Sequence, residues 1–514
     1  KTRPQNYEAI AYHYEEAGEE VLSLENYVKA GERAAKAYAN PEAERHFLAA
    51  LDLVVDEPER AHLLGELALV LSRLSKFELA IGKWLEGIGL YRGQGAQELT
   101  ARYYARAARA AWEAGDVPRG LALGQEGIRA LEGAPDSQGL ADLCHEAGRA
   151  YYFNGQAGEA LPILTRSLEM AEKTGALAVQ VEALISLGTA GITTSLAPLQ
   201  ECIQSLERAA ELARSHGLPD QESRALNNLS VTQTHHLGDL THTRENMQRA
   251  EELARSTGSI GIALFYGANA CGYSLLQGDL AWASERLPAL QETQRELPTA
   301  ITSGLTVQAT NGMLLRQSGR VDETLEHLRQ LDRAARGSGE YNTVYTTAVY
   351  FADAALEFDV HHDEALAMLS QLNQGHLYGG RVWPLTLIAR LQAAQGKLAE
   401  AEKTFQQAKT EAGEPPFGLS PVWLGLAEAQ LARAKGTPDQ ASAAYQRCVE
   451  AAGKAGMRWH QAWVKREWAE ALITEAQGQA TDRARELLEE ARAEFESMGA
   501  PIYADRIRAR LSKL

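Results

Sequence analysis

Small and bulky apolar residues recur along the chain at a spacing typical of helices. The stretch Ala80-Ile-Gly-Lys-Trp84-Leu-Glu-Gly87 holds a small residue, a bulky apolar residue four positions later, and a small residue three positions after that. Positions i, i+4 and i+7 lie on one stripe of an α-helix, because 3.6 residues make one turn. The pattern predicts a helix that approaches its neighbour closely at the small residues and fills the remaining space with the bulky one.

The same triplet returns along almost the whole chain. Its first small position is occupied by Ala43, Ala80, Gly120, Ala160, Cys202, Thr243, Ala283, Thr324, Ala365, Ala401, Ala441 and Ala484. The position four residues later is bulky and apolar in every repeat except one, where it is Gly124. Successive repeats are separated by 36 to 43 residues. A period near forty residues predicts a stacked array of about twelve helical hairpins, and alternating β-type runs are essentially absent, so the predicted fold class is all-α.

Turn residues divide each repeat into a helix A, a short turn and a helix B. The turns are marked by Ser75-Lys76, Gly115-Asp116, Gly155-Gln156, Gly238-Asp239, Gly278-Asp279, Gly319-Arg320, Gly396-Lys397 and Gly436-Thr437. Glycine suits a helix end that needs a positive φ, and Asp or Thr suits the start of the next helix. Two repeats lack this signal, at residues 191–198 and 359–364, and there we expect longer or kinked turns.

The repeat also determines the expected domain organisation. A chain of 514 residues would ordinarily suggest three or four domains. A solenoid instead grows by adding neighbours, and no Pro-, Gly- or Ser-rich linker interrupts this one. We predict lead-in helices over residues 1–26, one array over 27–500 and a capping helix over 501–514, which has an apolar stripe on one side and Arg on the other. Because the chain begins at Lys1 close to helical sequence, we expect it to be a piece of a longer protein.

The net charge indicates which partners to expect, and the cysteines indicate the cellular compartment. The net charge of −17 argues against duplex nucleic acid or an anionic membrane as the main partner. The four cysteines form no CxxC pair, which favours buried thiols in a reducing compartment. No stretch approaches the roughly 18 apolar residues of a membrane helix, and no secretory signal opens the chain. We therefore expect a cytoplasmic location.

Several segments resemble a known family. The segment Ala147-Gly148-Arg-Ala-Tyr151-Tyr-Phe-Asn-Gly155-Gln-Ala-Gly-Glu-Ala160 resembles a tetratricopeptide repeat almost position by position, in the longer form of about forty residues found in large bacterial signalling proteins. The segments 10–18 and 495–505 resemble the junction and the closing repeat of STAND-class signal-transduction ATPases, LuxR-type regulators and multidomain adenylate cyclases.

The resemblance has consequences for the fold and the role of the chain. It implies a right-handed α-α superhelix in which the A helices line a concave groove. It also implies that this chain is the sensor arm of a switch protein, often a transcription regulator, whose upstream part binds a nucleotide. No Walker A sequence occurs here, so the ATPase itself is not in this chain.

The groove positions of the family, carried over with the turn glycines as anchors, give a candidate binding surface. The positions are His62, Arg73, Arg102, Arg109, Trp112, Asp142, His145, Arg149, Tyr152, Asn227, His235, Arg316, Gln317, Trp383 and Arg390. We hypothesise that repeats two to four bind an acidic or phosphorylated ligand, or an acidic peptide, through bidentate Arg contacts and stacking on Trp112 and Tyr152. In the alternative interpretation these Arg side chains form i,i+4 pairs with Glu or Asp and are solvated.

Catalytic and metal-binding motifs are missing from the sequence. It contains no HExxH, no GxSxG, no GxGxxG after a strand and no EF-hand loop, so we predict a non-enzymatic chain without a cofactor. The clusters His235-His236 and His361-His362-Asp363-Glu364 are better explained as polar surface than as metal sites. The aromatic residues at 341–351, Trp383 and the tryptophans at 459–468 have the spacing of core residues.

Two functions remain in view. The first is a sensor arm that binds a protein, a peptide or a small acidic effector in its groove and contacts an upstream nucleotide-binding domain. The second is a constitutive scaffold for protein assembly without switching. An enzyme with an unrecognised site would be a third, for which the sequence offers no positive feature.

Overall fold

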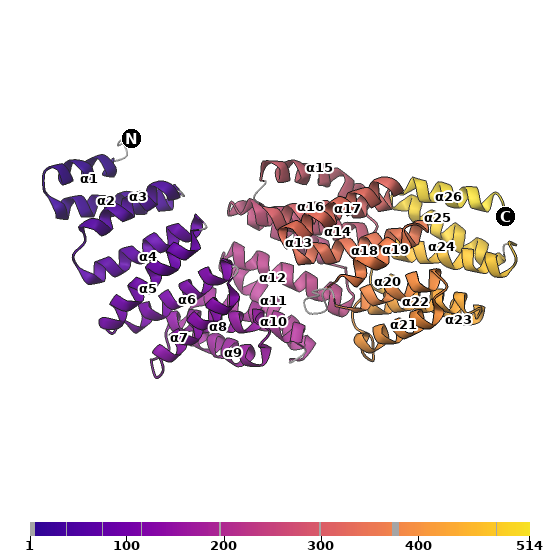
Figure 1. Ribbon diagram of the computed structural model, residues 1–514, viewed down its shortest axis with the longest axis horizontal. Coiled ribbons are helices and arrows are strands. Elements are labelled where there is room, and N and C mark those ends of the chain that lie inside the picture. Colours follow the sequence, from indigo (N-terminus) through magenta and orange to yellow (C-terminus); the bar gives the residue numbers. More distant parts are fainter. Residues whose placement is uncertain are drawn as a thin grey trace. The chain divides into compact units, whose positions relative to one another are not determined.

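The described part of the chain consists of helices. The computed structural model describes residues 6–37, 39–74, 76–114, 116–194, 197–297, 300–372, 380–479 and 481–514. Within these ranges every regular element is helical, which confirms the all-α prediction (Figure 1). The chain divides into two compact units, Lys1–Gln221 and Glu222–Leu514, and the boundary falls inside helix α12 (Pro219–Thr232).

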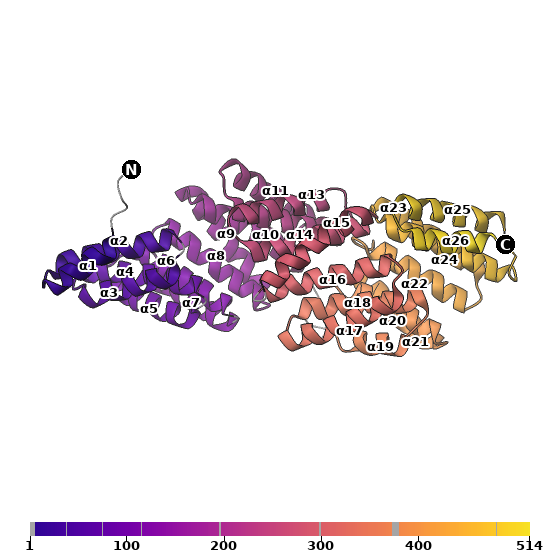
Figure 2. The same ribbon diagram turned by 90° about the horizontal axis from the view of Figure 1, so that it is seen from above.

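Unit 1 is a run of antiparallel hairpins. Its helices are α1 (Tyr7–Glu16), α2 (Glu20–Lys36), α3 (Asn40–Leu53), α4 (Glu57–Arg73), α5 (Phe77–Gly93), α6 (Gln97–Glu113), α7 (Val117–Ala130), α8 (Gln138–Phe153), α9 (Ala157–Thr174), α10 (Leu177–Thr194) and α11 (Leu199–Ser215). Each helix packs against the next one along the chain, as the indigo-to-magenta ribbons of Figures 1 and 2 show.

Unit 2 continues the same alternation. It holds most of α12, a π-helical turn η1 (Gln233–Leu237), and then α13 (Thr243–Ser256), α14 (Ile260–Leu276), α15 (Leu280–Glu296), α16 (Ile301–Gln317), α17 (Val321–Ser338), α18 (Tyr341–Phe358), α19 (His362–Ser370), α20 (Val382–Ala394), α21 (Leu398–Ala412), α22 (Ser420–Ala434), α23 (Pro438–Lys454), α24 (Arg458–Glu475), α25 (Asp482–Ser497) and α26 (Pro501–Leu511). The even-numbered helices α2–α24 are the A helices and the odd-numbered helices α3–α25 are the B helices.

The repeating triplet lies where the spacing predicts. Every one of its positions on the B helices is buried, including the stripe of Ala160 and Leu164 in unit 1 and that of Thr243 and Met247 in unit 2. The small residues let each B helix approach its partner, and the bulky residues fill the interior of the stack. The helical-hairpin repeat is therefore confirmed.

Gly124, the exception in the bulky column, has a steric reason. A Cβ atom placed on Gly124 would lie 2.9 Å from the Cβ and 3.0 Å from the Cα of Ala147 on α8. Helix α7 thus lies closer to α8 than a bulky residue would permit. Gly127, one turn later on the same stripe, is equally close to Tyr104 and Leu143.

Most turns between A and B helices are short, but α12 leads into η1 before α13, and residues 476–481 separate α24 from α25. Gly278 and Gly396 have φ values of 82° and 75°, as expected for glycines that end a helix, and Asp279 accepts a hydrogen bond from the backbone N–H of Trp282. The turn at 359–361, where we expected a longer or kinked turn, has the same length as the turns at Gly278 and Gly396. Its Asp359 and His361 adopt left-handed φ values of 55° and 53°, and Asp359 takes the place of the glycine. Ser75, Gly115 and residues 195–196 of the other unusual turn lie outside the described residues.

Unit 2 contains contacts between repeats far apart in the sequence. The Tyr503 hydroxyl of α26 donates to the Glu357 carboxylate of α18 at 2.5 Å and lies 3.0 Å from the carbonyl oxygen of Arg316 on α16. Helix α14 also contacts α24. Early and late hairpins of this unit therefore pack together, an arrangement that a repeat with contacts only between neighbours does not require.

The four cysteines (Cys144, Cys202, Cys271 and Cys448) are free and buried, as the sequence predicts. Among the described helices, none combines the length and the apolar character that crossing a bilayer requires.

Candidate ligand-binding site

In unit 1, the A helices α6 and α8 bring two predicted arginines to one buried carboxylate. Arg149 Nη1 lies 3.0 Å from Glu146 Oε2, and Arg109 Nη1 lies 3.5 Å from Glu146 Oε1. Burial opposes ionisation of Glu146, yet Arg149, His145 and Arg109 hold the pKa of its carboxyl well below the usual range. Arg149 is itself buried, so this ion pair orients it firmly.

Aromatic side chains lie beside this ion pair. The Arg149 guanidinium lies 4.6 Å from the centre of the Trp112 ring, and Trp112 and Tyr152 each approach Phe153, with ring centres 5.4 Å and 5.0 Å apart. Trp112 and Tyr152 are half-buried, and Phe153 is 40 % exposed. We call Trp112, Arg149, Tyr152 and Phe153 the Trp112 patch. A planar or negatively charged group could stack on its rings next to a fixed positive charge.

Metal-type spacing occurs next to the patch. Among the described residues, only Asp142, His145 and Glu146 bring three possible ligand atoms within 4.8 Å of one another. These groups already have other partners or favour the protonated state. His145 Nε2 lies 3.0 Å from Ser186 Oγ, and the Glu146 carboxylate forms ion pairs with Arg109 and Arg149. Burial raises the pKa of Asp142, which disfavours the carboxylate form that a metal ion would need. A cation here would have to displace the guanidinium groups, so the cluster is better explained as a buried ion-pair network.

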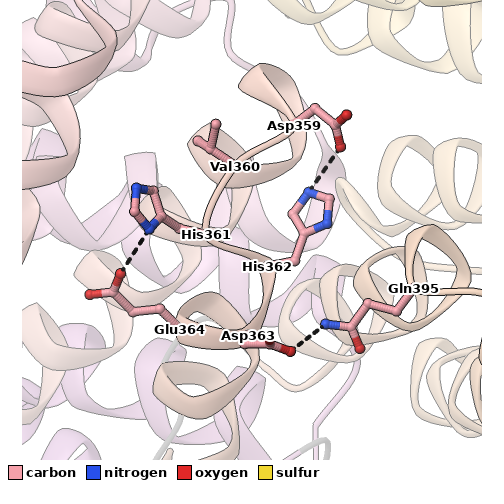
Figure 3. A pocket seen from close by; sticks show the side chains of 7 residues that line it. All are labelled: Asp359, Val360, His361, His362, Asp363, Glu364 and Gln395. Carbon is pink, nitrogen blue, oxygen red and sulfur yellow. Dashed lines mark hydrogen bonds and ion pairs between the residues drawn. The ribbon is translucent and has the colours of Figure 1, made fainter.

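The histidine-rich turn at 359–364 lines an open pocket together with Gln395 (Figure 3). His361 Nδ1 faces Glu364 Oε2 at 3.5 Å, and His362 Nε2 faces Asp359 Oδ1 at 3.4 Å. The two rings lie on different sides of the turn, each beside its own carboxylate (Figure 3). This arrangement agrees with a polar surface.

The remaining predicted residues of unit 1 are spread over exposed surface. His62 is exposed on α4. Arg73 is exposed and donates from Nη1 to the carbonyl oxygen of Ala35 at 3.2 Å. Arg102 forms an i,i+4 ion pair with Glu98 at 2.9 Å, as the alternative interpretation expects.

In unit 2, three of the predicted residues lie on α12, η1 and α16. Asn227 is half-buried on α12 and donates to Asn228 Oδ1 at 3.0 Å. His235 belongs to η1, where burial lowers its pKa to about 4. Gln317 is buried on α16 and donates to the carbonyl oxygen of Leu275 at 3.3 Å.

Helices α16, α18 and α20 bring Arg316 and Arg390 together, whereas Trp383, seven residues before Arg390 on α20, contacts Tyr350 and Trp423. Arg316 pairs with Glu357 at 2.7 Å and with Asp353 at 3.5 Å, while Arg390 Nη1 lies 3.3 Å from the other oxygen of Asp353. Arg316 and Arg390 are 5 % and 2 % exposed, so this network is interior.

Sequence reasoning missed several of the residues that complete these clusters. They are Glu146, Phe153, Asp353, Glu357, Trp423 and, as a site residue, Trp463. The useful signal was their spacing of three, four or seven residues from other cluster residues on the same A helices, which places them on the same face. Phe351, Trp459 and Trp468 are buried, as expected for core aromatics, whereas Tyr350 and Trp383 keep exposed surface.

Comparison with known proteins adds little beyond the architecture. No protein-family model matches the chain, and no curated protein matches its sequence. Among solved structures it is similar to the apo form of RapI, with 14 % identity over 54 % of this chain and 99 % of that one and a TM-score of 0.43. It is also similar to the APC/C hetero-tetramer Cut9–Hcn1, with 13 % identity over 98 % and 95 % of the two chains and a TM-score of 0.44. The helical-hairpin repeat is established by the helices of this chain themselves.

Proposed function

We propose that this chain is a non-enzymatic binding arm that recognises an acidic effector or an acidic peptide through the Trp112 patch of unit 1. In the larger protein it would act as the sensor of a STAND-type ATPase switch and would contact an upstream nucleotide-binding domain. The observation that carries the proposal is the combination of a buried, oriented arginine with three accessible aromatic rings on neighbouring A helices.

The chemistry of the patch favours a negatively charged ligand with a flat surface. Arg149 is fixed by Glu146 and lies over Trp112, so its position needs no reordering when a ligand arrives. Arg109 is 35 % exposed at the side chain and extends the positive surface beside the patch. A guanidinium next to aromatic faces binds carboxylate or phosphate and stacks on planar groups.

A sensor also needs two states with different affinities. If the effector binds one arrangement of the hairpins better than another, it shifts the population toward that arrangement, and the coupling to the nucleotide-binding domain follows from this difference. A constitutive scaffold would bind its partner with no such shift. The local ion pairs of Arg102 with Glu98 and of Arg109 with Glu113 count against ligand binding at these two arginines, since they satisfy the arginines without a ligand.

Fluorescence anisotropy with a fluorescein-labelled Glu-rich peptide tests the patch, with a Lys-rich peptide as the charge control. Trp112→Ala is expected to weaken binding of the Glu-rich peptide by about tenfold, the value of one cation–π or stacking contact of ~1–2 kcal/mol. The matched control is Tyr12→Ala, which removes a 52 % exposed aromatic ring from α1. Equal affinities for the two variants, or for the two peptides, would contradict the proposal.

The switch is tested in the full-length reading frame that contains this chain. A nucleotide-binding module upstream of Lys1 supports the sensor, and its hydrolysis rate should respond to the effector in the parent protein but not in the Trp112→Ala variant. A reading frame without such a module supports the scaffold.

A further inference from the structure

Four consecutive A helices of unit 2 carry the same pair of positions. Tyr350 of α18, Trp383 of α20, Trp423 of α22 and His460 of α24 form one row, which we call the aromatic row. Neighbouring ring centres are 6.0, 4.7 and 5.1 Å apart, and the two tryptophans stack with an interplanar angle of 4°. The row therefore crosses the four helices without interruption.

A second row lies seven residues further along each helix. It consists of Glu357, Arg390, Gln430 and Glu467, and we call it the polar row. Seven residues are two turns, so the polar row lies on the same helix face about 10 Å from the aromatic row. Arg390 is its one cation, and it donates from Nε to Gln430 Oε1 at 2.9 Å.

Buried N–H donors without acceptors occur in both rows and at Trp463, which lies between the row positions His460 and Glu467 on α24. Arg390 Nη2, Trp463 Nε1 and Trp383 Nε1 have no hydrogen-bond partner among the described residues, and Arg390 and Trp463 are 2 % and 3 % exposed. The Arg390 guanidinium lies 5.6 Å from the centre of the Trp463 ring. A buried donor without a hydrogen bond destabilises the folded protein by roughly 1–3 kcal/mol, and by more if the group is charged. An acceptor that binds to these donors would therefore gain this free energy.

The charge of that acceptor follows from the surroundings of Arg390. Asp353 is shared between Arg316 and Arg390, and its remaining oxygen faces Arg316 at 3.5 Å. Arg390 therefore shares its paired carboxylate, that of Asp353, with a second arginine. Burial and the neighbouring Arg316 lower the pKa of Arg390, whereas Asp353 and Glu467 raise it. An anion with two acceptor atoms would complete the pairing.

Part of the aromatic row remains accessible. Tyr350 and Trp383 are half-buried, whereas Trp423 and His460 are 6 % and 5 % exposed. A ligand that reaches Arg390 can thus lay an apolar, planar portion against the Tyr350 end of the row.

We propose that unit 2 binds a small aromatic carboxylate, with its carboxylate at Arg390 Nη2 and Trp463 Nε1 and its ring against Tyr350 and Trp383. This site uses residues of α18–α24 and does not rest on the function proposed for unit 1. It requires no movement of the Asp353 ion pairs, because Arg390 offers an N–H group that they leave unused.

Isothermal titration calorimetry of the whole chain tests the site, with 3-phenylpropionate as the probe. Saturable binding is expected for 3-phenylpropionate, with affinities at least about tenfold weaker for the neutral 3-phenylpropanol and for acetate, which has no ring. The proposal is overturned if 3-phenylpropionate gives no saturable heat, because water alone would then satisfy the donors. It is also overturned if acetate binds with the same affinity, because the site would then bind any small anion.

Variants locate the binding. Trp463→Phe keeps an aromatic ring but removes the N–H group together with the rest of the pyrrole ring. It is expected to weaken 3-phenylpropionate binding about fivefold to tenfold, as expected for one lost hydrogen bond of ~1–1.5 kcal/mol. Arg390→Gln is expected to weaken it further, and its thermal unfolding shows whether the fold is retained. The matched control is Trp468→Phe, since Trp468 Nε1 already donates to Ser442 Oγ at 3.1 Å. An unchanged affinity in Trp463→Phe, or an equal loss in Trp468→Phe, contradicts the assignment.

Discussion

Buried ionisable side chains in this chain behave according to the partners they have. Glu146 is buried with two guanidinium groups and stays charged, whereas His460 is buried with no carboxylate paired to it and stays neutral. Burial, followed by the charge of Arg316, lowers the pKa of His460 to about 3. The two residues therefore respond oppositely to desolvation, because only one of them has a compensating charge.

The neutral His460 predicts acid sensitivity of unit 2. An unfolded histidine takes up a proton near pH 6.5, but folded His460 does so only near pH 3. As the pH falls below about 6.5, the unfolded state gains a proton that the folded state lacks, and the free energy of unfolding decreases by up to about 1.4 kcal/mol per pH unit. His460→Gln should reduce this slope by about that amount in urea unfolding at pH 7, 6 and 5.

The control for this measurement is His62→Gln, which changes an exposed histidine on α4. Its slope should match that of the parent chain. If His460→Gln keeps the full pH dependence, His460 does not stay neutral in the folded state.

At the scale of helices, the distance between neighbours is set by which residue occupies the bulky column. Trp84 and Leu164 separate their hairpins, while Gly124 lets α7 approach Ala147 of α8. This close approach positions α8, which carries Glu146 and Arg149, next to its neighbours. The exception in the repeat thus occurs beside the candidate site of unit 1.

Gly124→Ala is predicted to destabilise the chain. Its new methyl group would lie 2.9 Å from the Ala147 Cβ, and overpacking of this kind costs about 1–3 kcal/mol. Gly82→Ala is the matched control, because a Cβ on this helical glycine of α5 meets no atom within 4 Å and should stabilise the helix by about 0.5–1 kcal/mol. Chemical unfolding of the two variants measures both effects, and a stabilising Gly124→Ala would show that α7 can move away.

The helices and their hairpins could be predicted because their causes are local. The small-then-bulky spacing of Thr243 and Met247, and the glycine of turns such as Gly278, act within a few residues of the sequence. The left-handed Asp359 was harder to foresee, since Asp adopts this conformation less readily than glycine. Three residues of the Trp112 patch, Trp112, Arg149 and Tyr152, followed from the repeat register. Its fourth residue, Phe153, and the adjoining Glu146 did not, because their roles depend on neighbouring helices.

At the scale of the whole molecule, the contact between Tyr503 and Glu357 joins residues 146 positions apart. The repeat period carries information about adjacent hairpins only, so no pattern in the sequence indicates this contact. It changes the expected energetics of unit 2. Hairpins in an open array unfold with their neighbours, whereas α16, α18 and α26 are expected to lose structure together.

Tyr503→Phe tests this cooperativity. Removing the hydroxyl takes a donor from Glu357, whose side chain is fully buried, and should cost about 1–3 kcal/mol. Hydrogen exchange should show lower protection in α16 and α18 as well as in α26. Tyr12→Phe, at an exposed tyrosine of α1, should leave these helices unchanged. Faster exchange confined to α26 would contradict the expected coupling.

The same contact limits how unit 2 can evolve. A stack with free ends tolerates duplication or loss of a hairpin, since the remaining members still meet an equivalent surface. Between Glu357 and Tyr503, however, an added or missing hairpin would carry the tyrosine away from its acceptor. We therefore expect related chains to keep a constant number of repeats over this segment and to vary in length elsewhere.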